Sequence, residues 1–254
     1  MRLDSLLAER GLFESRTRAA AAVLAGSVRL GPGRRRAEKP GQLVDPGIEL
    51  EVDAPPPYVS RGGIKLANAL DALGVPVAGR RALDVGASTG GFTDCLLQRG
   101  AAHVVALDVA YGELDYRLRE DDRVTVLERV NARALTPDQL PYRPDLITID
   151  VSFISLTKVL PAVLAAAAPQ FDCLAMVKPQ FEVGRERVGK GGVVRDPELR
   201  REAVTAVADG ARALGATVMG AAPSSLAGPS GNRETFLWLA EGGRDGAPEQ
   251  LTAW

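Results

Sequence analysis

The chain has 254 residues, of which 46% are hydrophobic and 25% charged, and its formal net charge is −1. This length and composition can bury a full core and are typical of a soluble protein with one large domain or two unequal ones. We expect no membrane span, because the best apolar run, residues 159–168, is short and interrupted by Pro161. Asp4 and Glu9 argue against a signal peptide. Two cysteines and one histidine without ligand spacing predict no metal site, and a reducing, cytoplasmic location fits best.

Residues 1–54 predict a small α/β domain. Leucines recur at helical spacing before Gly11, and a second helix is predicted from a cap at Ser15 or Thr17 to Gly26. Two stretches of alternating apolar and polar residues follow and predict strands, at 27–30 and 48–52.

This segment also carries a local excess of positive charge. Residues 1–40 contain nine Arg or Lys against four Asp or Glu, and acidic residues follow directly, so the basic character belongs to one face or end. Two short helices, small strands and a basic face resemble an S4-type RNA-binding module. A small accessory domain with a solvated basic face explains the same pattern, and both interpretations stay open here. The first interpretation assigns to RNA Arg10, Arg16, Arg18 and, in a predicted loop, Arg34, Arg35 and Arg36.

A proline-rich stretch separates this segment from the rest of the chain. Residues 54–57 read Ala-Pro-Pro-Pro, which is stiff and extended. We therefore predict a linker at residues 55–60 and a second domain at residues 61–242. Residues 243–254 are polar and glycine-rich and predict a flexible tail.

The second domain alternates apolar strands with amphipathic helices, which predicts an α/β fold with a parallel sheet. Residues 223–232 are turn-like, so the last two strands are expected to form an antiparallel hairpin. A seven-stranded sheet with a reversed last strand resembles S-adenosylmethionine-dependent methyltransferases and disfavours a dehydrogenase-type fold. Cys95 and Cys173 are expected to be apolar core residues, and Trp238 is also assigned to the core. The strands are expected at 82–86, 103–108, 124–127, 145–150, 173–178, 216–222 and 234–240.

A glycine-rich turn follows the first of these strands and leads into a helix. Doubly wound α/β proteins form a nucleotide-type pocket in this way, and Asp108, after the next strand, is a carboxylate of the kind that binds ribose hydroxyls. Residues 86–90 (Gly-Ala-Ser-Thr-Gly) also match the nucleophile elbow of α/β-hydrolases. That chemistry needs an acid and then a histidine after the serine, and the single histidine, His103, follows only fifteen residues later at a predicted solvated strand end. The hydrolase interpretation is therefore disfavoured.

Charged residues stand at the predicted strand ends. Asp150 and Lys178 each close a strand, and Glu234 opens the reversed strand, so all three are expected at the rim where open α/β sheets bind ligands. Lys65 lies in the first turn of a helix, where the macrodipole disfavours a cation. Turn capping, exposure or a simple ion pair explains each residue structurally. If the four converge beside the glycine-rich turn, they can prepare a lysine to take a proton from an alcohol.

Five segments resemble the TlyA family, also called hemolysin A, in order and spacing. They are 61–65 (RGGIK), 84–92 (DVGASTGGF), 150–156 (DVSFISL), 178–184 (KPQFEVG) and 228–234 (GPSGNRE). Members are ribosomal RNA ribose 2′-O-methyltransferases with an N-terminal S4 domain and an FtsJ-like catalytic domain. The resemblance implies S-adenosylmethionine as cofactor and methyl transfer to cytidine 2′-hydroxyls in ribosomal RNA. The short segment before the first helix favours the large subunit, with the small subunit as the alternative.

The resemblance also implies roles for individual residues. The catalytic tetrad falls on Lys65, Asp150, Lys178 and Glu234, with Lys178 as the base. Asn131 is expected either near the adenine or simply in a turn. A glycine-rich basic loop at 184–194 is either a solvated loop or a contact to RNA phosphates. The predicted cofactor-binding residues are Asp84, Gly86, Ser88, Gly90, Gly91, Phe92, Asp108 and Asn131, and further RNA contacts are predicted at Arg61, Arg185, Arg187 and Lys190.

Two other functions compete with this one. A non-catalytic RNA-binding factor for ribosome assembly would keep the fold without turnover, and the complete tetrad counts against it. A membrane-lytic activity, which the family's other name suggests, is disfavoured because no amphipathic or spanning segment is long enough. The sequence makes no prediction of the oligomeric state.

Overall fold

The structure is a computed structural model that describes residues 1–54, 56–228 and 230–246. The chain divides into two compact units, Met1–Pro56 and Pro57–Trp254, each of which has its own core. The division falls inside the proline-rich stretch at residues 54–57.

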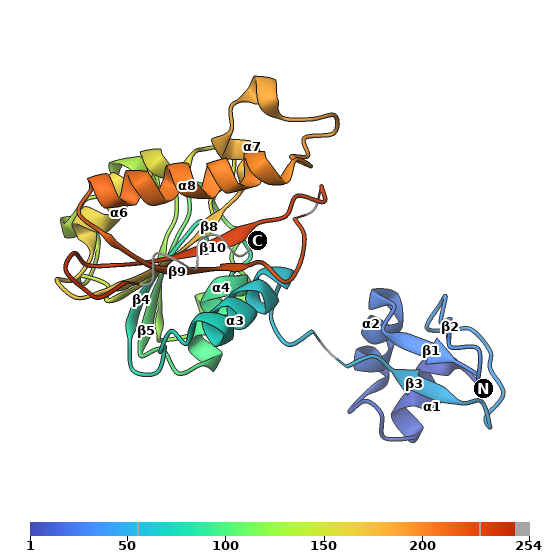
Figure 1. Ribbon diagram of the computed structural model, residues 1–254. Helices are drawn as coiled ribbons and strands as arrows, with labels where there is room; N and C mark the ends of the chain where they lie inside the picture. Colours follow the sequence, from blue (N-terminus) through green and yellow to red (C-terminus); the bar gives the residue numbers. More distant parts are fainter. Residues whose placement is uncertain (55, 229, 247–254) are drawn as a thin grey trace. The chain divides into compact units, whose positions relative to one another are not determined.

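The N-terminal unit packs two helices on a small antiparallel sheet with strand order β2-β1-β3 (Figure 1). The side chain of Ser15 accepts a hydrogen bond from the Arg18 backbone and begins the second helix, and Gly26 ends it with a φ of 76°. The elements are α1 (Leu3–Glu9), α2 (Arg16–Ala25), β1 (Val28–Leu30), β2 (Arg35–Arg36) and β3 (Leu50–Val52).

One local prediction in this unit was wrong. Arg35 and Arg36 do not belong to a loop but form β2, opposite Leu30 and Arg29 of β1. Neither residue carries the apolar alternation by which a strand is recognised, because both side chains of this edge strand are exposed.

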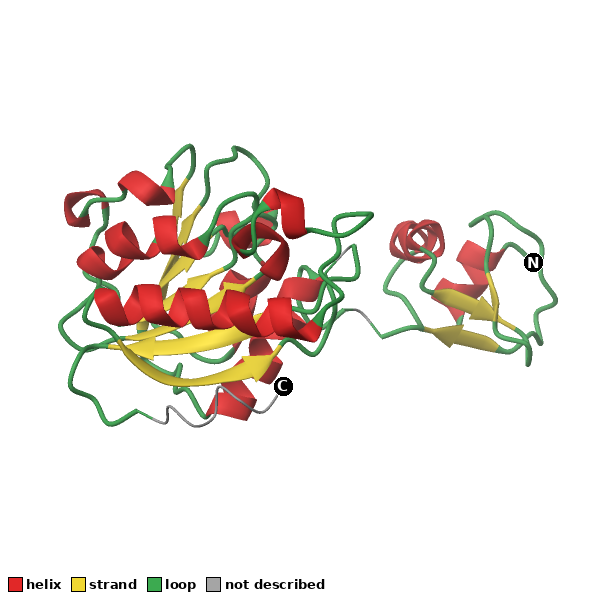
Figure 2. Ribbon diagram, turned by 45° about the horizontal axis from the view of Figure 1, so that its top comes forward, coloured by secondary structure: helices red, strands yellow, loops and turns green. Residues whose placement is uncertain are grey.

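The larger unit is built on a seven-stranded sheet with the order β6-β5-β4-β7-β8-β10-β9 (Figures 1 and 2). Only β10 runs against its neighbours, and it pairs with β9 as the predicted antiparallel hairpin. All seven predicted strands exist, with ends that move by one residue at most. They are β4 (Arg81–Val85), β5 (His103–Leu107), β6 (Val124–Leu127), β7 (Leu146–Ile149), β8 (Asp172–Val177), β9 (Thr217–Pro223) and β10 (Thr235–Ala240).

Helices cover both faces of this sheet (Figure 1). Because strand side chains alternate, Leu83 and Val85 pack in one core cluster with α6 and α8, while Ala82 packs in another with α3 and α4. Asp196 caps α8 by accepting a hydrogen bond from the Glu198 backbone, and α8 ends at Ala213. The helices are α3 (Arg61–Leu73), α4 (Gly91–Gln98), α5 (Tyr116–Arg119), α6 (Leu160–Ala166), α7 (Pro179–Glu182) and α8 (Pro197–Ala213); 3-10 turns are η1 (Ala132–Ala134), η2 (Pro137–Gln139), η3 (Leu156–Lys158) and η4 (Arg185–Arg187).

Two features concern what the described part of the chain lacks. None of its helices combines the length and the hydropathy that a bilayer crossing requires. The same residues contain no group of three or more His, Cys, Asp or Glu placed to hold a metal ion.

The single histidine is packed rather than solvated, which corrects the expectation. His103 opens β5, but its Nδ1 lies 2.8 Å from the hydroxyl of Tyr142 and its Nε2 lies 3.3 Å from that of Thr125. Burial of the ring lowers the pKa of His103. Cys95 and Cys173 are free thiols buried in the core, as predicted.

The C-terminal end of β10 is tied by one carboxylate. Trp238 was assigned to the core but is only half-buried; its ring packs against the core, and its indole Nε1 donates to Asp172 Oδ1 at 2.9 Å. Arg244, in the segment predicted to be a flexible tail, forms ion pairs with Asp172 and Glu241. The first residues of that segment are therefore anchored, and residues 247–254 lie outside the described part of the chain.

Candidate active site

Strand ends place the predicted catalytic residues at one edge of the sheet. The parallel strands β4, β7 and β8 are followed by Gly86, Asp150 and Lys178. The reversed strand β10 begins at Thr235, which pairs with the last residue of β8. Glu234 therefore arrives at the same edge from the other direction.

The four charged residues form two ion pairs around one cavity of about 490 Å³. Lys65 Nζ lies 2.5 Å from Glu234 Oε2, and these side chains are only 8% and 2% exposed. Lys178 Nζ lies 2.5 Å from Asp150 Oδ1 and forms an ion pair with it, although the two groups are not aligned as in a hydrogen bond. The same Nζ donates a hydrogen bond to Ser152 Oγ at 2.9 Å. The structure thus brings together all four residues, and it adds Ser152 as a further partner of Lys178.

Lys65 reaches this cavity from the second turn of α3. Ser60 caps α3 by accepting from the Gly62 backbone, and the buried ion pair with Glu234 offsets the unfavourable position of a cation near a helix N-terminus. A Cβ on Gly91, at the start of α4, would lie 2.1 Å from Ser60 Oγ. A glycine at this position therefore lets the starts of α3 and α4 meet beside the cavity.

The glycine-rich turn lines the same cavity as the tetrad. Gly86 has a φ of +85°, and a Cβ there would lie 2.5 Å from the backbone oxygen of Asp150. The turn contributes Gly86, Ser88, Gly91 and Phe92 to the cavity wall. A ligand on this turn and a substrate at the tetrad would therefore share one space.

Asp84 does not face the cavity, contrary to its assignment as a cofactor contact. Its carboxylate is fully buried and accepts hydrogen bonds from the hydroxyls of Thr93 and Thr148, so it joins α4 to β4 and β7. Burial, together with the nearby charge of Asp150, raises the pKa of Asp84 to about 7. Gly90 is likewise absent from the cavity wall; a Cβ there would lie 2.3 Å from Leu118.

A second carboxylate group borders the glycine-rich turn. Asp108 accepts hydrogen bonds from the backbones of Ser88 and Ala110, both at 2.8 Å, and Ser88 Oγ donates to Glu113 at 3.1 Å. This position suits the carboxylate of a ribose-binding site. Asn131, by contrast, caps η1 through its side chain and lines none of the cavities around the turn.

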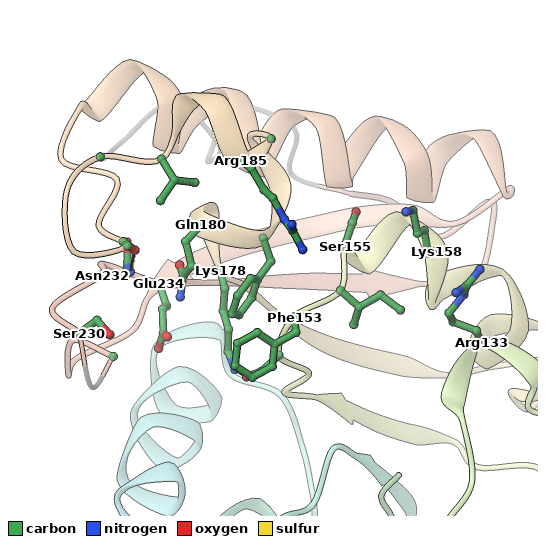
Figure 3. A pocket seen from close by; sticks show the side chains of 18 residues that line it. Arg133, Phe153, Ser155, Lys158, Lys178, Gln180, Arg185, Ser230, Asn232 and Glu234 are labelled. Carbon is green, nitrogen blue, oxygen red and sulfur yellow. Dashed lines mark hydrogen bonds between the residues drawn. The ribbon is translucent and has the colours of Figure 1, made fainter.

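A larger cavity of about 930 Å³ adjoins the tetrad, and Lys178 and Glu234 line both spaces. Figure 3 shows these two residues at one end of it and Arg133 at the other. Phe153 lies in its wall, 92% exposed, with a φ of +63° and its ring 5.3 Å from that of Phe181. The exposure of Phe153 could not be predicted from the sequence, because an aromatic residue in an apolar segment after a strand usually indicates burial.

Glu182 is a further residue that the sequence analysis missed. Its carboxylate on α7 accepts from Ser155 Oγ at 2.6 Å and from the Leu156 backbone at 2.9 Å, so it ties α7 to the loop after β7. Burial raises the pKa of Glu182. The two segments joined in this way carry Lys178 and Ser152.

The predicted RNA-binding residues of the larger unit differ in their surroundings. Arg61 lines the tetrad cavity and donates to the backbone oxygen of Ala227 at 3.0 Å. Arg185 lines the larger cavity, and Lys190 is exposed on the loop that follows. Arg187 forms an ion pair with Glu202 of α8.

In the N-terminal unit, five of the six arginines assigned to RNA have partners within the unit. Arg35 is the exception, since its side chain has none among the residues that the structure describes. The partners are Pro46 and Ile48 oxygens for Arg10, Asp4 for Arg16, Glu14 for Arg18, Glu51 for Arg34 and the Ala25 oxygen for Arg36.

Comparison with known proteins gives consistent matches. The model of the FtsJ-like methyltransferase family matches residues 58–241. The 16S/23S rRNA (cytidine-2′-O)-methyltransferase TlyA of Mycobacterium tuberculosis is 53% identical over 240 residues, 94% of this chain and 89% of the relative. The 23S rRNA (cytidine-2′-O)-methyltransferase TlyA of Campylobacter jejuni is 34% identical, covering 71% of this chain and 70% of the relative.

A solved structure extends the likeness to the fold of nearly the whole chain. A protein from Streptococcus thermophilus shares 38% sequence identity with a TM-score of 0.75, over 99% of this chain and 94% of that one. Together with the assembled tetrad, these matches show that the chain belongs to the TlyA family of FtsJ-like methyltransferases.

Proposed function

We propose that this protein transfers a methyl group from S-adenosylmethionine to the ribose 2′-hydroxyl of cytidines in ribosomal RNA. The observation that carries the proposal is the single cavity in which the glycine-rich turn and both ion pairs, Lys65–Glu234 and Lys178–Asp150, meet. The names of the relatives supply the substrate class. A ribosomal RNA substrate also suits the predicted cytoplasmic location.

The residues beside the turn fit this cofactor. The backbone at Gly86 and Gly91 leaves no room for a side chain, and Asp108 is placed to accept hydrogen bonds from ribose hydroxyls. When bound, the cofactor supplies a sulfonium methyl group, which is already electrophilic. The protein's tasks are therefore to orient the 2′-hydroxyl and to remove its proton.

Lys178 is the base in this proposal. Its Nζ accepts the proton of the 2′-hydroxyl, so that the ribose oxygen could take the methyl group that the bound cofactor would supply. Asp150 and Ser152 hold Nζ in place, and Asp150 stabilises the ammonium that results. The buried Lys65–Glu234 pair forms the facing wall and presents a second cation to the ribose.

Two substitutions of Lys178 test the proposal. Lys178→Ala removes the base, and Lys178→Arg keeps a cation beside Asp150 that does not give up its proton. Both are expected to lower kcat for transfer of labelled methyl groups into ribosomal RNA by about 100-fold or more, while calorimetry shows nearly unchanged cofactor binding. Arg212→Gln, an exposed residue paired with Asp209 on α8, is the control. Full activity of Lys178→Arg would overturn the assignment of the base.

Mapping of the methylated nucleotides decides which ribosomal subunit the protein modifies. The relative that is named for both 16S and 23S RNA is 53% identical, whereas the one named for 23S RNA alone is 34% identical. These identities favour both subunits, against the expectation from the short N-terminus. Mapping of 2′-O-methyl groups in ribosomal RNA from cells with and without the protein distinguishes the two outcomes. If Lys178→Ala restored every phenotype of a deletion strain, the protein would be a non-catalytic assembly factor instead.

A further inference from the structure

A third cavity, of about 430 Å³, adjoins the tetrad cavity. It lies between the N-terminal end of α8 and the turn that joins β9 to β10 (Figure 1). Ala227 and Glu234 line both spaces. We name it the arginine cavity after Arg200, Arg201 and Arg233, which line it.

The arginine cavity is positively charged. Arg200 and Arg233 have no hydrogen-bond or ion-pair partner for their side chains among the described residues, and Arg201 pairs with Glu198. The one carboxylate residue in the wall is Glu234, whose charge is already matched by Lys65. Two guanidinium groups without counterions in one hollow make a site for an anion.

Hydroxyl groups complete the wall. Ser225 Oγ accepts from the side chain of Asn68 at 2.6 Å, which leaves its own proton free to donate. Ser224 also lines the cavity, but its hydroxyl donates to the Leu226 backbone oxygen at 2.9 Å. Planar guanidinium forks together with a hydroxyl donor match the oxygens of a phosphate group. The chemical class that fits is therefore a phosphate or phosphodiester.

The distribution of unmatched charge points to a polyanion rather than a small anion. Every arginine from residue 80 to residue 129 has a carboxylate or an aromatic ring as partner. The cations of the larger unit without a partner among its described residues line the two cavities that adjoin the tetrad cavity or lie on the loop after α7; they are Arg133, Lys158, Arg185, Lys190, Arg195, Arg200 and Arg233.

We infer that the arginine cavity binds a backbone phosphodiester of the substrate RNA, on the strand that flanks the target nucleotide. The inference rests on the proposed function for the identity of the substrate. The phosphate contact holds the strand while the adjoining tetrad cavity receives the ribose. It carries no base specificity, because phosphates are alike in every sequence.

The test compares the double variant Arg200→Gln/Arg233→Gln with the control Arg212→Gln, which lies on the same helix but outside the cavity. For the double variant we expect KM for ribosomal RNA to rise about 10-fold and the slope of log Kd against log salt to fall by about one, because one phosphate contact is lost. Its kcat at saturating RNA and its cofactor affinity stay unchanged, and Arg212→Gln matches the original protein. Thermal unfolding confirms that both variants are folded.

A second measurement locates the contact on the RNA. Oligonucleotides with one neutral methylphosphonate linkage near the target are expected to bind the original protein more weakly wherever the linkage replaces a contacted phosphate. The double variant is expected to be insensitive to the replacement at one of these positions, the one bound in the arginine cavity. An unchanged KM and salt slope, or a loss of kcat without a change in KM, would overturn the inference. The salt dependence of Kd and the binding of methylphosphonate oligonucleotides are both measured without methyl transfer. If the original protein transferred no methyl groups, the proposed function would be refuted, but these two binding measurements would still test the inference.

Discussion

At the scale of single residues, Gly86 sets how closely the glycine-rich turn approaches the tetrad. Its φ is +85°, and a Cβ there would lie 2.5 Å from the backbone oxygen of Asp150. Gly112 offers a matched comparison, because its φ is +77° while a Cβ there would meet nothing within 4 Å. The two positions share the cost of a left-handed backbone and differ only in the close approach.

We therefore expect Gly112→Ala to destabilise the protein by about 1 kcal/mol. The variant protein is expected to bind the cofactor with unchanged affinity. Gly86→Ala is expected to cost more than this and to abolish cofactor binding, because the added methyl group must displace the turn or Asp150. Urea unfolding and calorimetry measure the two effects. Equal behaviour of the two variants would show that the close approach at Gly86 has no functional consequence.

Asp84 is expected to make stability depend on pH. Burial raises its pKa to about 7 from the ordinary value of 3.8 for an aspartate, so the folded state binds the proton more tightly than the unfolded state does. The stabilisation from this group is therefore fully present below about pH 4 and is lost as the pH rises through 7.

The variant Asp84→Asn removes this titration. The free energy of unfolding of the original protein, measured relative to Asp84→Asn by urea denaturation, is expected to fall between pH 5 and pH 7.5. Parallel stability profiles for the two proteins would contradict the raised pKa.

At the scale of elements, the site depends on two segments that Glu182 holds together. Lys178 precedes α7, and Ser152 belongs to the loop after β7. Glu182 joins these segments through Ser155 and the Leu156 backbone. Glu182→Ala leaves the Leu156 N–H without an acceptor, whereas Ser155 Oγ still has Thr157 Oγ1 at 2.7 Å. The loss is expected to cost about 1–3 kcal/mol of stability.

We expect Glu182 to position the catalytic residues as well as to stabilise the fold. Because Ser152 and Lys178 then lose their fixed separation, Glu182→Ala is expected to lower kcat about 10-fold or more with cofactor affinity unchanged. Glu182→Gln keeps an acceptor oxygen for the Leu156 backbone and is expected to restore most of kcat. If both variants lost stability and kept kcat, Glu182 would be purely structural.

At the scale of the whole molecule, the N-terminal unit is expected to contribute binding energy for RNA rather than chemistry. Arg35 is its predicted RNA contact without a partner among the described residues, while Arg10 donates to the oxygens of Pro46 and Ile48 within the unit. Arg35→Gln is therefore expected to raise KM for ribosomal RNA several-fold at low salt without changing stability. Arg10→Gln is expected mainly to destabilise the unit. Thermal unfolding and kinetics at two salt concentrations separate the two effects, and a reversed pattern would contradict this division of roles.

The elements of the larger unit were accessible from the sequence because their signals are local. The parallel strands are short, nearly continuous apolar runs, and the glycine-rich turn follows β4 directly. The assignment of Asp84 to the cofactor was wrong because it rested on the short distance along the chain between Asp84 and the glycine-rich turn. Successive side chains of a strand point to opposite faces of the sheet, and this alternation decides where the carboxylate lies. Asp84 shares the parity of Ala82, which packs with α3 and α4, so its side chain points beneath the turn.

By itself, the sequence determined the order of the elements, the family, the three charged residues at the strand ends and Lys65 on its helix, since each depends on neighbours in the chain. It did not determine which lysine pairs with which carboxylate, because Lys65 and Glu234 are 169 residues apart and only the packing of α3 against the sheet brings them within 2.5 Å. The exposure of Phe153 and the charge of the arginine cavity were likewise decided by tertiary structure. Both depend on what lies around a side chain in space, and spacing along the chain carries no information about that.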